Sequence, residues 1–183
     1  MFEVRKAVIG DLPIIMKIIE SARIRLKADG SPQWQDGYGP NEASMCAAIQ
    51  QGVCRVGLLA SQLVAVACLI PGIDDVYTAI ENGQWADNSD NERYLSIHRF
   101  AVSSDFSGQG VATSFLEALK TEAFHHGYRD LRIDTYPKNQ AMIRVIEKNG
   151  FEYRGMVYFP IPDGERVAFQ MVLDSHSQSD RYE

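Results

Sequence analysis

An extended segment, a short polar loop and a helix follow one another between residues 94 and 126, and this order constrains the fold most. Residues 94–102 are rich in aromatic and β-branched side chains, which favour a strand. From Val111 onward, apolar residues recur at spacings of three and four, which predicts an amphipathic helix. Gly108 and Gly110 lie in the loop between them. A further alternating strand at 130–135 makes a strand-helix-strand crossover, so we expect these two strands to be parallel.

The glycine loop has the chemistry of an anion-binding site. A Gly-x-Gly turn that opens a helix leaves several backbone N–H groups unpaired at the positive end of the helix dipole, so the turn can hold a phosphate or a pyrophosphate. Side chains at Gly108 and Gly110 would block a close approach of the ligand to the backbone. The loop therefore predicts a phosphate-bearing ligand.

Two nucleotide-binding motifs share this shape. A dinucleotide fingerprint would take Thr113 as its third small residue and Asp130 as its acidic residue. In that fold, however, the strand runs almost directly into the first glycine, near the start of the domain. Here polar and aromatic residues intervene, and about half of the chain comes before. A Walker-type P-loop is disfavoured because no Gly-Lys-Ser/Thr follows.

The stretch from Phe100 to Ala112 resembles the acetyl-CoA loop of the GNAT family of N-acetyltransferases, whose core pattern is Gln/Arg-x-x-Gly-x-Gly/Ala. A second block, from Asn139 to Phe151, resembles the later Asn-x-x-Ala…Glu-Lys-x-Gly-Phe signature of that family. Either block alone is a weak signal, whereas both in this order are a strong one. The resemblance extends over roughly residues 2–173.

The resemblance implies that acetyl-CoA is the acetyl donor and that a primary amine of a small molecule or protein attacks the thioester directly. It implies that the pyrophosphate binds to the amides of the glycine loop, and that the pantetheine arm pairs with the strand before it. The cofactor-binding residues that follow are Phe100, Ala101, Val102, Ser107, Gly108, Gln109, Gly110, Val111, Ala112, Thr113, Asn139 and Met142.

The reaction also requires a base, because an alkylamine has a pKa near 10 and must lose a proton before it attacks. In a regular strand Ser96, His98 and Phe100 would share one face, and the resemblance implies that the base, or the residues that order a water, lie on this strand. His98 titrates near neutral pH, so we predict His98 and Ser96 as the catalytic residues. A packed structural histidine is the alternative.

Two departures from the family pattern bear on the mechanism. Asp105 occupies the Gln/Arg position of the loop, and Ser107 stands where the family often has arginine, so phosphate binding would depend more on backbone dipoles. Ile146 stands where many relatives have a tyrosine that protonates the leaving thiolate. Tyr136 and Tyr158 are conceivable substitutes; otherwise CoA leaves as a thiolate. This departure motivates the alternative of a non-catalytic domain that binds acyl-CoA.

The sequence defines the binding pocket of the amine acceptor less well than the cofactor site. The resemblance implies that it is built from the first helices and the loop between them, where Trp34 and Tyr38 would form one wall as substrate-binding residues. Asp36 or Glu42 would attract a cationic amine. Alternatively, the two aromatic side chains simply cover the core. The sequence therefore identifies no acceptor.

The remaining patterns predict one mixed α/β domain over residues 1–173, with a polar tail at 174–183. We expect a three-layer α/β/α fold around a mostly antiparallel sheet of about seven strands; the resemblance implies the form in which the central parallel pair splays apart. The segment 74–91 is polar and acidic, and the pattern does not assign it.

The composition of the chain argues against several classes of partner. A net charge of −6 argues against nucleic acid as a partner, and the three cysteines, which lack metal-ligand spacing, predict no metal site. No signal peptide or long apolar run is present, so we expect a cytoplasmic protein without a membrane span. The resemblance adds the possibility of a homodimer.

Overall fold

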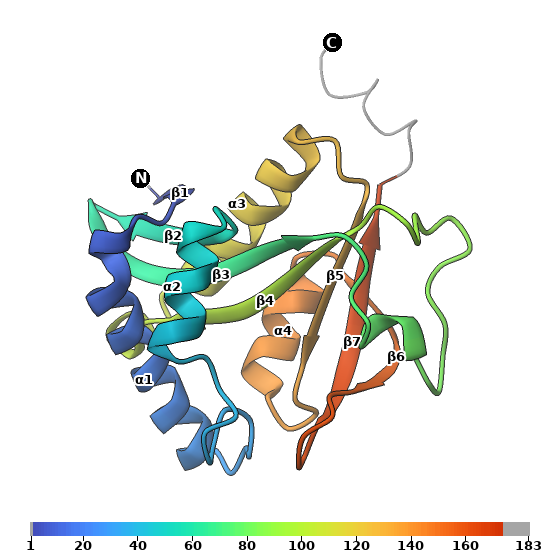
Figure 1. The fold of residues 1–183 in the computed structure, drawn as a ribbon, viewed down its shortest axis with the longest axis horizontal. Helices are drawn as coiled ribbons and strands as arrows, with labels where there is room; N and C mark the ends of the chain where they lie inside the picture. The colour runs from blue at the N-terminus through green and yellow to red at the C-terminus, as the bar shows by residue number, and fades with distance from the viewer. Residues whose placement is uncertain (1, 174–183) are drawn as a thin grey trace.

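The computed structural model describes residues 2–173, and the predicted polar tail at 174–183 lies outside the described residues. Within them, the strands form a seven-stranded mixed sheet in the order β1-β2-β3-β4-β5-β7-β6 (Figure 1). The elements are β1 (Phe2–Lys6), α1 (Leu12–Ala28), α2 (Glu42–Gln50), β2 (Cys54–Leu59), β3 (Gln62–Pro71), β4 (Leu95–Val102), α3 (Val111–His125), β5 (Asp130–Thr135), α4 (Gln140–Lys148), β6 (Glu152–Tyr158) and β7 (Glu165–Val172), with short 3-10 helices η1 (Ile9–Asp11), η2 (Tyr77–Ala79) and η3 (Ser104–Phe106).

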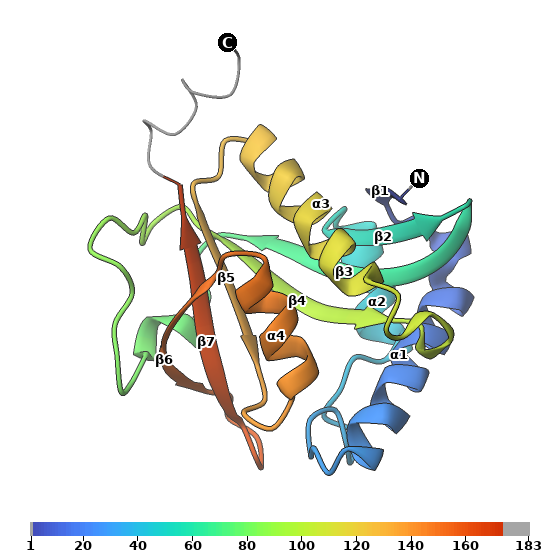
Figure 2. The same cartoon turned by 180° about the vertical axis from the view of Figure 1, so that it is seen from behind.

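The sheet is the middle of three layers. Helices α1 and α2 cover one face, and α3 and α4 cover the other, as the two opposite views show (Figures 1 and 2). One buried cluster joins α3 and α4 to the sheet through side chains such as Phe115 and Ile146, and a second joins α1 and α2 through Ile15 and Met45. Both faces of the sheet are thus buried, and the predicted three-layer fold is confirmed.

The central parallel pair separates after a short contact. β4 and β5 are paired from Leu95 with Leu131 to Ile97 with Ile133, and beyond this point they diverge (Figure 1). Along the same stretch β4 stays paired with β3 on its other edge, and β5 stays paired with β7. The splayed parallel pair implied by the family resemblance is therefore present.

A β-bulge interrupts β4 where the two strands separate. His98 pairs with Cys68 and Ala101 pairs with Val66, so Arg99 and Phe100 together oppose one residue of β3. Arg99 has a φ of 54°, in the left-handed region that non-glycine residues rarely adopt. The extra residue changes which side chains share a face of the sheet.

This bulge corrects one expectation from the sequence. Phe100 does not share a face with His98: its ring packs 5.3 Å from Phe115 of α3, centroid to centroid. Arg99 instead lies on the opposite face, where its guanidinium donates to the carbonyl of Ser44 in α2. Strict alternation fails because two consecutive residues of a bulge occupy one position of the ladder.

Asparagine side chains cap the first turns of two helices. The side chain of Asn41 accepts a hydrogen bond from the amide of Ser44 at the start of α2, and Asn139 does the same for Met142 at the start of α4. The hairpin turn between β2 and β3 is formed by Ala60 and Ser61, both with positive φ, as a type I′ turn requires.

The unassigned segment 74–91 packs against the sheet beside β5 and β7. It contains η2, and its Tyr77 is buried with Tyr94 and Val157 in a third apolar cluster. Trp85 lies over the guanidinium of Arg132, which is 4.2 Å from the indole centroid. The sequence pattern did not predict this packing, because the segment is mainly polar and acidic and has few aromatic residues to anchor it.

No helix within residues 2–173 is both long enough and apolar enough to cross a membrane.

Candidate active site

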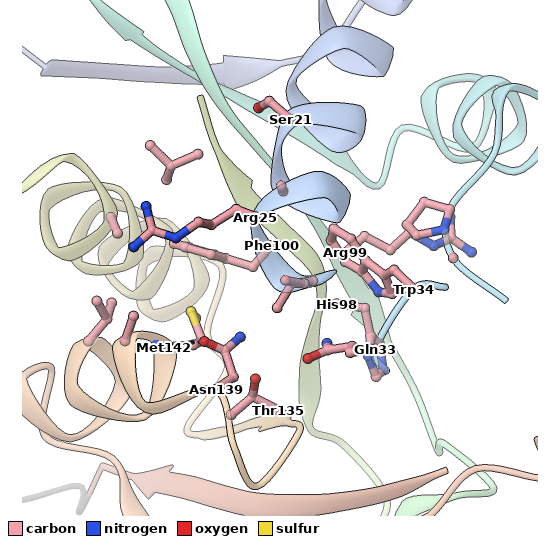
Figure 3. A pocket seen from close by; sticks show the side chains of 18 of the residues that line it. Ser21, Arg25, Gln33, Trp34, His98, Arg99, Phe100, Thr135, Asn139 and Met142 are labelled. Atoms are coloured by element: carbon pink, nitrogen blue, oxygen red, sulfur yellow. Dashed lines mark hydrogen bonds between the residues drawn. The ribbon is translucent and has the colours of Figure 1, made fainter. Parts of the chain in front are cut away.

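A cavity of about 740 Å³ opens where β4 and β5 diverge, and it reaches from the glycine loop to α1. In Figure 3, Asn139 and Met142 lie on one side of it, and Gln33, Trp34 and Arg99 lie on the other. The volume is within the range of small-molecule and cofactor sites. The splay of the parallel pair is thus also what creates the site.

The backbone amides of the glycine loop are available to a ligand. Gly108 and Gly110 both have a φ of 76°, which favours glycine, and Gly110 is the N-cap of α3. Among the described residues, no hydrogen-bond acceptor pairs with the amides of these glycines or with those of Val111, Ala112 and Thr113. The amide of Gln109 instead turns back to the carbonyl of Phe106, at 3.4 Å. Several donors at the helix N-terminus therefore remain unpaired, as an anion site requires.

The edge of β4 that faces the cavity is also unpaired. Beyond Ile97, no strand within residues 2–173 pairs with this edge, because β5 has diverged. On the other edge, the amide of Ser103 donates to the carbonyl of Val64 in β3, at 2.8 Å. Since amides alternate along a strand, the amide of Val102 points toward the cavity. An extended ligand can therefore add to β4 in the manner of a partial strand.

His98 is held in the cavity wall by two carboxylates. Its Nε2 lies 2.7 Å from Oδ2 of Asp74, and its Nδ1 lies 3.8 Å from Oδ2 of Asp134. The Tyr77 hydroxyl donates to the same Asp134 oxygen, at 2.6 Å. The other Asp134 oxygen lies 3.9 Å from Nε of Arg166. These contacts fix the orientation of the imidazole ring.

The same contacts change how these groups titrate. Burial alone would lower the pKa of His98, but its hydrogen bond to Asp74 and the charges of both aspartates raise it above the ordinary value. Burial likewise opposes ionisation of Asp74, yet the imidazole holds the pKa of that carboxyl below its usual range. For Asp134 burial prevails, and its pKa is raised. The site thus contains titratable groups with perturbed pKa values, which is typical of active sites.

Most of the residues predicted from the sequence meet in this cavity, although they come from four separate segments. Those that line it are Trp34, Tyr38, His98, Phe100, Val102, Ser107, Gly108, Gly110, Val111, Ala112, Thr113, Asn139 and Met142.

Three predicted residues lie outside the cavity wall. Ala101 is buried against α1 and α2, and the side chain of Gln109 donates to the carbonyl of Asp105 without lining the cavity. Ser96 is 1% exposed, and its hydroxyl has no hydrogen-bond partner among the described residues. Because it is sealed inside the sheet, it has no access to a substrate, so we retain only His98 as a candidate base.

The tyrosines considered as substitutes at the leaving group are also placed elsewhere. Tyr136 is buried and donates to Glu165, and Tyr158 is exposed on β6; neither lines the cavity. Ile146 is fully buried in the core beneath α4. None of these three residues lines the cavity.

Sequence reasoning missed several residues of the site. Asp134 is in β5, Arg166 is in β7 and Asp74 follows β3, so these charged groups converge only through the sheet order. Arg99 lines the cavity because of the bulge. The one available signal was Asp134 in an otherwise buried strand, since a buried carboxylate needs a partner.

Comparisons with known proteins agree with this geometry. Residues 26–151 match the model of the acetyltransferase (GNAT) family. An acetyltransferase of that family from Streptococcus agalactiae 2603 has a similar structure, with a TM-score of 0.84 and 38% identity, over 94% of this chain and 96% of that one.

More distant relatives extend the comparison. The uncharacterized N-acetyltransferase YesJ of Bacillus subtilis (strain 168) is 25% identical over 150 residues, which is 81% of each chain. The aminoglycoside acetyltransferase AAC(6')-Ib, solved in complex with coenzyme A, has the same fold at 20% identity, with a TM-score of 0.66 over 94% of this chain and 95% of that one. The family match spans more than half of the sequence, so this chain belongs to the acetyltransferase (GNAT) family.

Proposed function

We propose that this protein is an N-acetyltransferase that transfers the acetyl group of acetyl-CoA to a primary amine. The observation that carries the proposal is the meeting of three features in one cavity: the unpaired amides of the glycine loop and the first turn of α3, the open edge of β4 and the imidazole of His98. The complex of AAC(6')-Ib with coenzyme A supports the choice of cofactor, because that protein has the same fold.

Each step of the reaction has a group in the cavity. Amides at the start of α3 bind the pyrophosphate, and the pantetheine arm pairs with β4, so that the thioester lies beside His98. The imidazole takes the proton of the ammonium group, the amine nitrogen attacks the thioester carbon, and an amide of β4 stabilises the oxyanion. When the tetrahedral intermediate collapses, the electrons of the C–S bond pass to sulfur, the nitrogen loses its second proton to solvent, and CoA leaves as a thiolate.

The first test measures binding and turnover separately. CoA and acetyl-CoA are expected to raise the melting temperature of the protein, whereas NAD is not, and a broad amine panel is expected to include acceptors that release free thiol from acetyl-CoA. No shift at millimolar CoA would contradict the proposal. Binding without thiol release from any amine would favour the alternative of a non-catalytic acyl-CoA-binding domain, which the buried Ile146 motivates.

A second prediction concerns the glycine loop. A Cβ at Gly110 would meet no protein atom within 4 Å, so it would project into the space that the phosphates need. We expect Gly110→Ala to weaken CoA binding by about tenfold or more, measured by calorimetric titration. The backbone strain of a side chain at positive φ should also cost about 1 kcal/mol of stability.

Gly52 offers a matched control for this strain. It has a φ of 72°, and a Cβ there would also meet nothing within 4 Å, but it lies at the end of α2 away from the cavity. Gly52→Ala should lose similar stability and keep the CoA affinity of the unaltered protein. Equal affinities in the two variants would show that the phosphates do not bind at Gly110.

A further inference from the structure

Arg99 differs from the other two arginines of the cavity wall in having no carboxylate partner. Within residues 2–173 its NH1 donates to the carbonyl of Ser44, at 3.2 Å, its side chain also contacts the Cys68 thiol, and no aspartate or glutamate pairs with it. A guanidinium has five N–H donors, so most of its donors remain for a ligand. The other arginines of the cavity wall are paired, Arg25 with Asp29 at 2.9 Å and Arg166 with Asp134 at 3.9 Å, and the imidazole of His98 is paired with Asp74 at 2.7 Å.

The bulge in β4 places Arg99 directly beside the candidate base. Because the extra residue breaks the alternation, Arg99 and His98 are consecutive and yet lie on the same face of the sheet. The left-handed φ of Arg99 is a strained conformation for a non-glycine residue, and such strain is often found at functional sites. A proton acceptor and a cation are thus adjacent in one wall.

The position of Arg99 assigns it to the acceptor rather than to CoA. Its hydrogen bond to Ser44 directs the side chain toward α2, and it lies with Trp34 across the cavity from Asn139 and Met142 (Figure 3). The unpaired amides that would hold the pyrophosphate are at the start of α3, on the other face of the sheet.

The carboxylates of the cavity do not favour a strongly cationic acceptor. Asp29 is already paired with Arg25, and Asp134 is engaged by Tyr77 and Arg166. Asp36 and Glu42, which were expected to attract a cationic amine, do not line the cavity at all. An acceptor with several ammonium groups would therefore find little compensation and would meet the charge of Arg99.

We propose that the acceptor is a primary amine that carries an oxyanion a few bonds away, which Arg99 binds while His98 takes the proton of the amine. This inference rests on the proposed acetyltransferase function. A planar guanidinium binds carboxylates and phosphates through two parallel hydrogen bonds, so amino acids and aminoalkyl phosphates are the two classes that fit. The aminoglycoside kanamycin, which AAC(6')-Ib binds, belongs to a different class.

The substrate-side test uses matched pairs of amines and the unaltered protein. Each amino acid is compared with its amide, and 2-aminoethyl phosphate with ethanolamine, by thiol release from acetyl-CoA. In the pair that is turned over fastest, the anionic member is expected to have a kcat/KM about tenfold or more above that of its partner without the oxyanion. Whether amino acids or aminoalkyl phosphates have the higher kcat/KM identifies the oxyanion as a carboxylate or a phosphate. Faster turnover of polyamines, kanamycin or neutral amines than of every anionic acceptor would overturn the inference.

The protein-side test replaces the cation. In Arg99→Gln the ratio of kcat/KM between the anionic amine and its neutral partner should fall to about one, mainly through KM, and Arg99→Lys should keep part of the preference. Arg23→Gln is the control, because Arg23 pairs with Glu20 on the surface of α1 and does not line the cavity. An unchanged ratio in Arg99→Gln, or a loss of CoA affinity in that variant, would contradict the assignment.

The two proposals fail in different ways. A protein that neither binds CoA nor releases thiol with any amine would refute the acetyltransferase function itself. If CoA binds but no amine is turned over, the role of Arg99 is tested by measuring amine binding instead of turnover. Anionic amines should raise the melting temperature of the CoA-saturated protein, and Arg99→Gln should abolish that increase. An equal increase in the variant would overturn the role of Arg99.

Discussion

His98→Gln is expected to lower kcat/KM for amine acetylation by roughly 100-fold to 10,000-fold, the usual contribution of a positioned general base. Glutamine is close in size to the imidazole but does not accept a proton near neutral pH. The loss should appear mainly in kcat, whereas the dissociation constant for CoA should stay the same, because His98 lies apart from the glycine loop. Steady-state kinetics with thiol detection and a CoA titration measure the two effects.

The pH dependence separates a catalytic from a structural histidine. A base acts when deprotonated, so kcat/KM should rise with pH through an inflection above 6.5, the ordinary pKa of histidine, because Asp74 and Asp134 raise the pKa of His98. Asp74→Asn removes one of these carboxylates and should move the inflection to lower pH. If His98 only supports the fold, its replacement would lower the melting temperature, and the Asp74→Asn inflection would not move.

Arg132→Met should destabilise the protein by about 3–5 kcal/mol, the usual cost of leaving a buried charge without its partner. The Arg132 side chain is 2% exposed and forms two hydrogen bonds with Asp130, which is fully buried. Its guanidinium also lies between the rings of Trp85 and Tyr94, 4.2 and 3.8 Å from their centroids. Denaturant titration of the free energy of unfolding tests this prediction.

A double variant tests the physical reason. Removing both charges, as in Arg132→Met with Asp130→Leu, should recover part of the lost stability, because no unpaired carboxylate remains buried. Gln170 donates to both oxygens of Asp130 and loses these bonds in the double variant, so full recovery is not expected. Arg23→Gln, at an exposed ion pair, should change stability by about 0.5 kcal/mol or less. A loss below about 1 kcal/mol in Arg132→Met would contradict the account.

The sequence predicted the local part of the fold closely. The strand expected at 94–102 is observed at Leu95–Val102, and the helix expected from Val111 begins at that residue. Periodicity and glycine positions determine such elements over a few residues, so a single sequence contains the necessary information. The glycine loop between them was found for the same reason.

The electrostatic part of the site was not predictable in this way. Asp74, Asp134 and Arg166 are far apart in the sequence, and they meet around His98 only because β5 lies between β4 and β7. The bulge at Arg99 has no signature that separates it from a regular strand, so the face of Phe100 was predicted wrongly. The charged groups around His98 thus depend on contacts between distant segments, and the face of Phe100 depends on one inserted residue. The local sequence pattern specifies neither.

The inserted residue in β4 has a consequence for comparing this protein with its relatives. Side chains before and after Arg99 follow opposite phases of the inward-outward alternation, because the ladder gains one residue there. Aligning this strand without a gap to a relative that lacks the insertion would match residues from opposite layers of the domain. Transfer of residue roles across the family therefore needs a change of register at this point, even where the neighbouring letters agree.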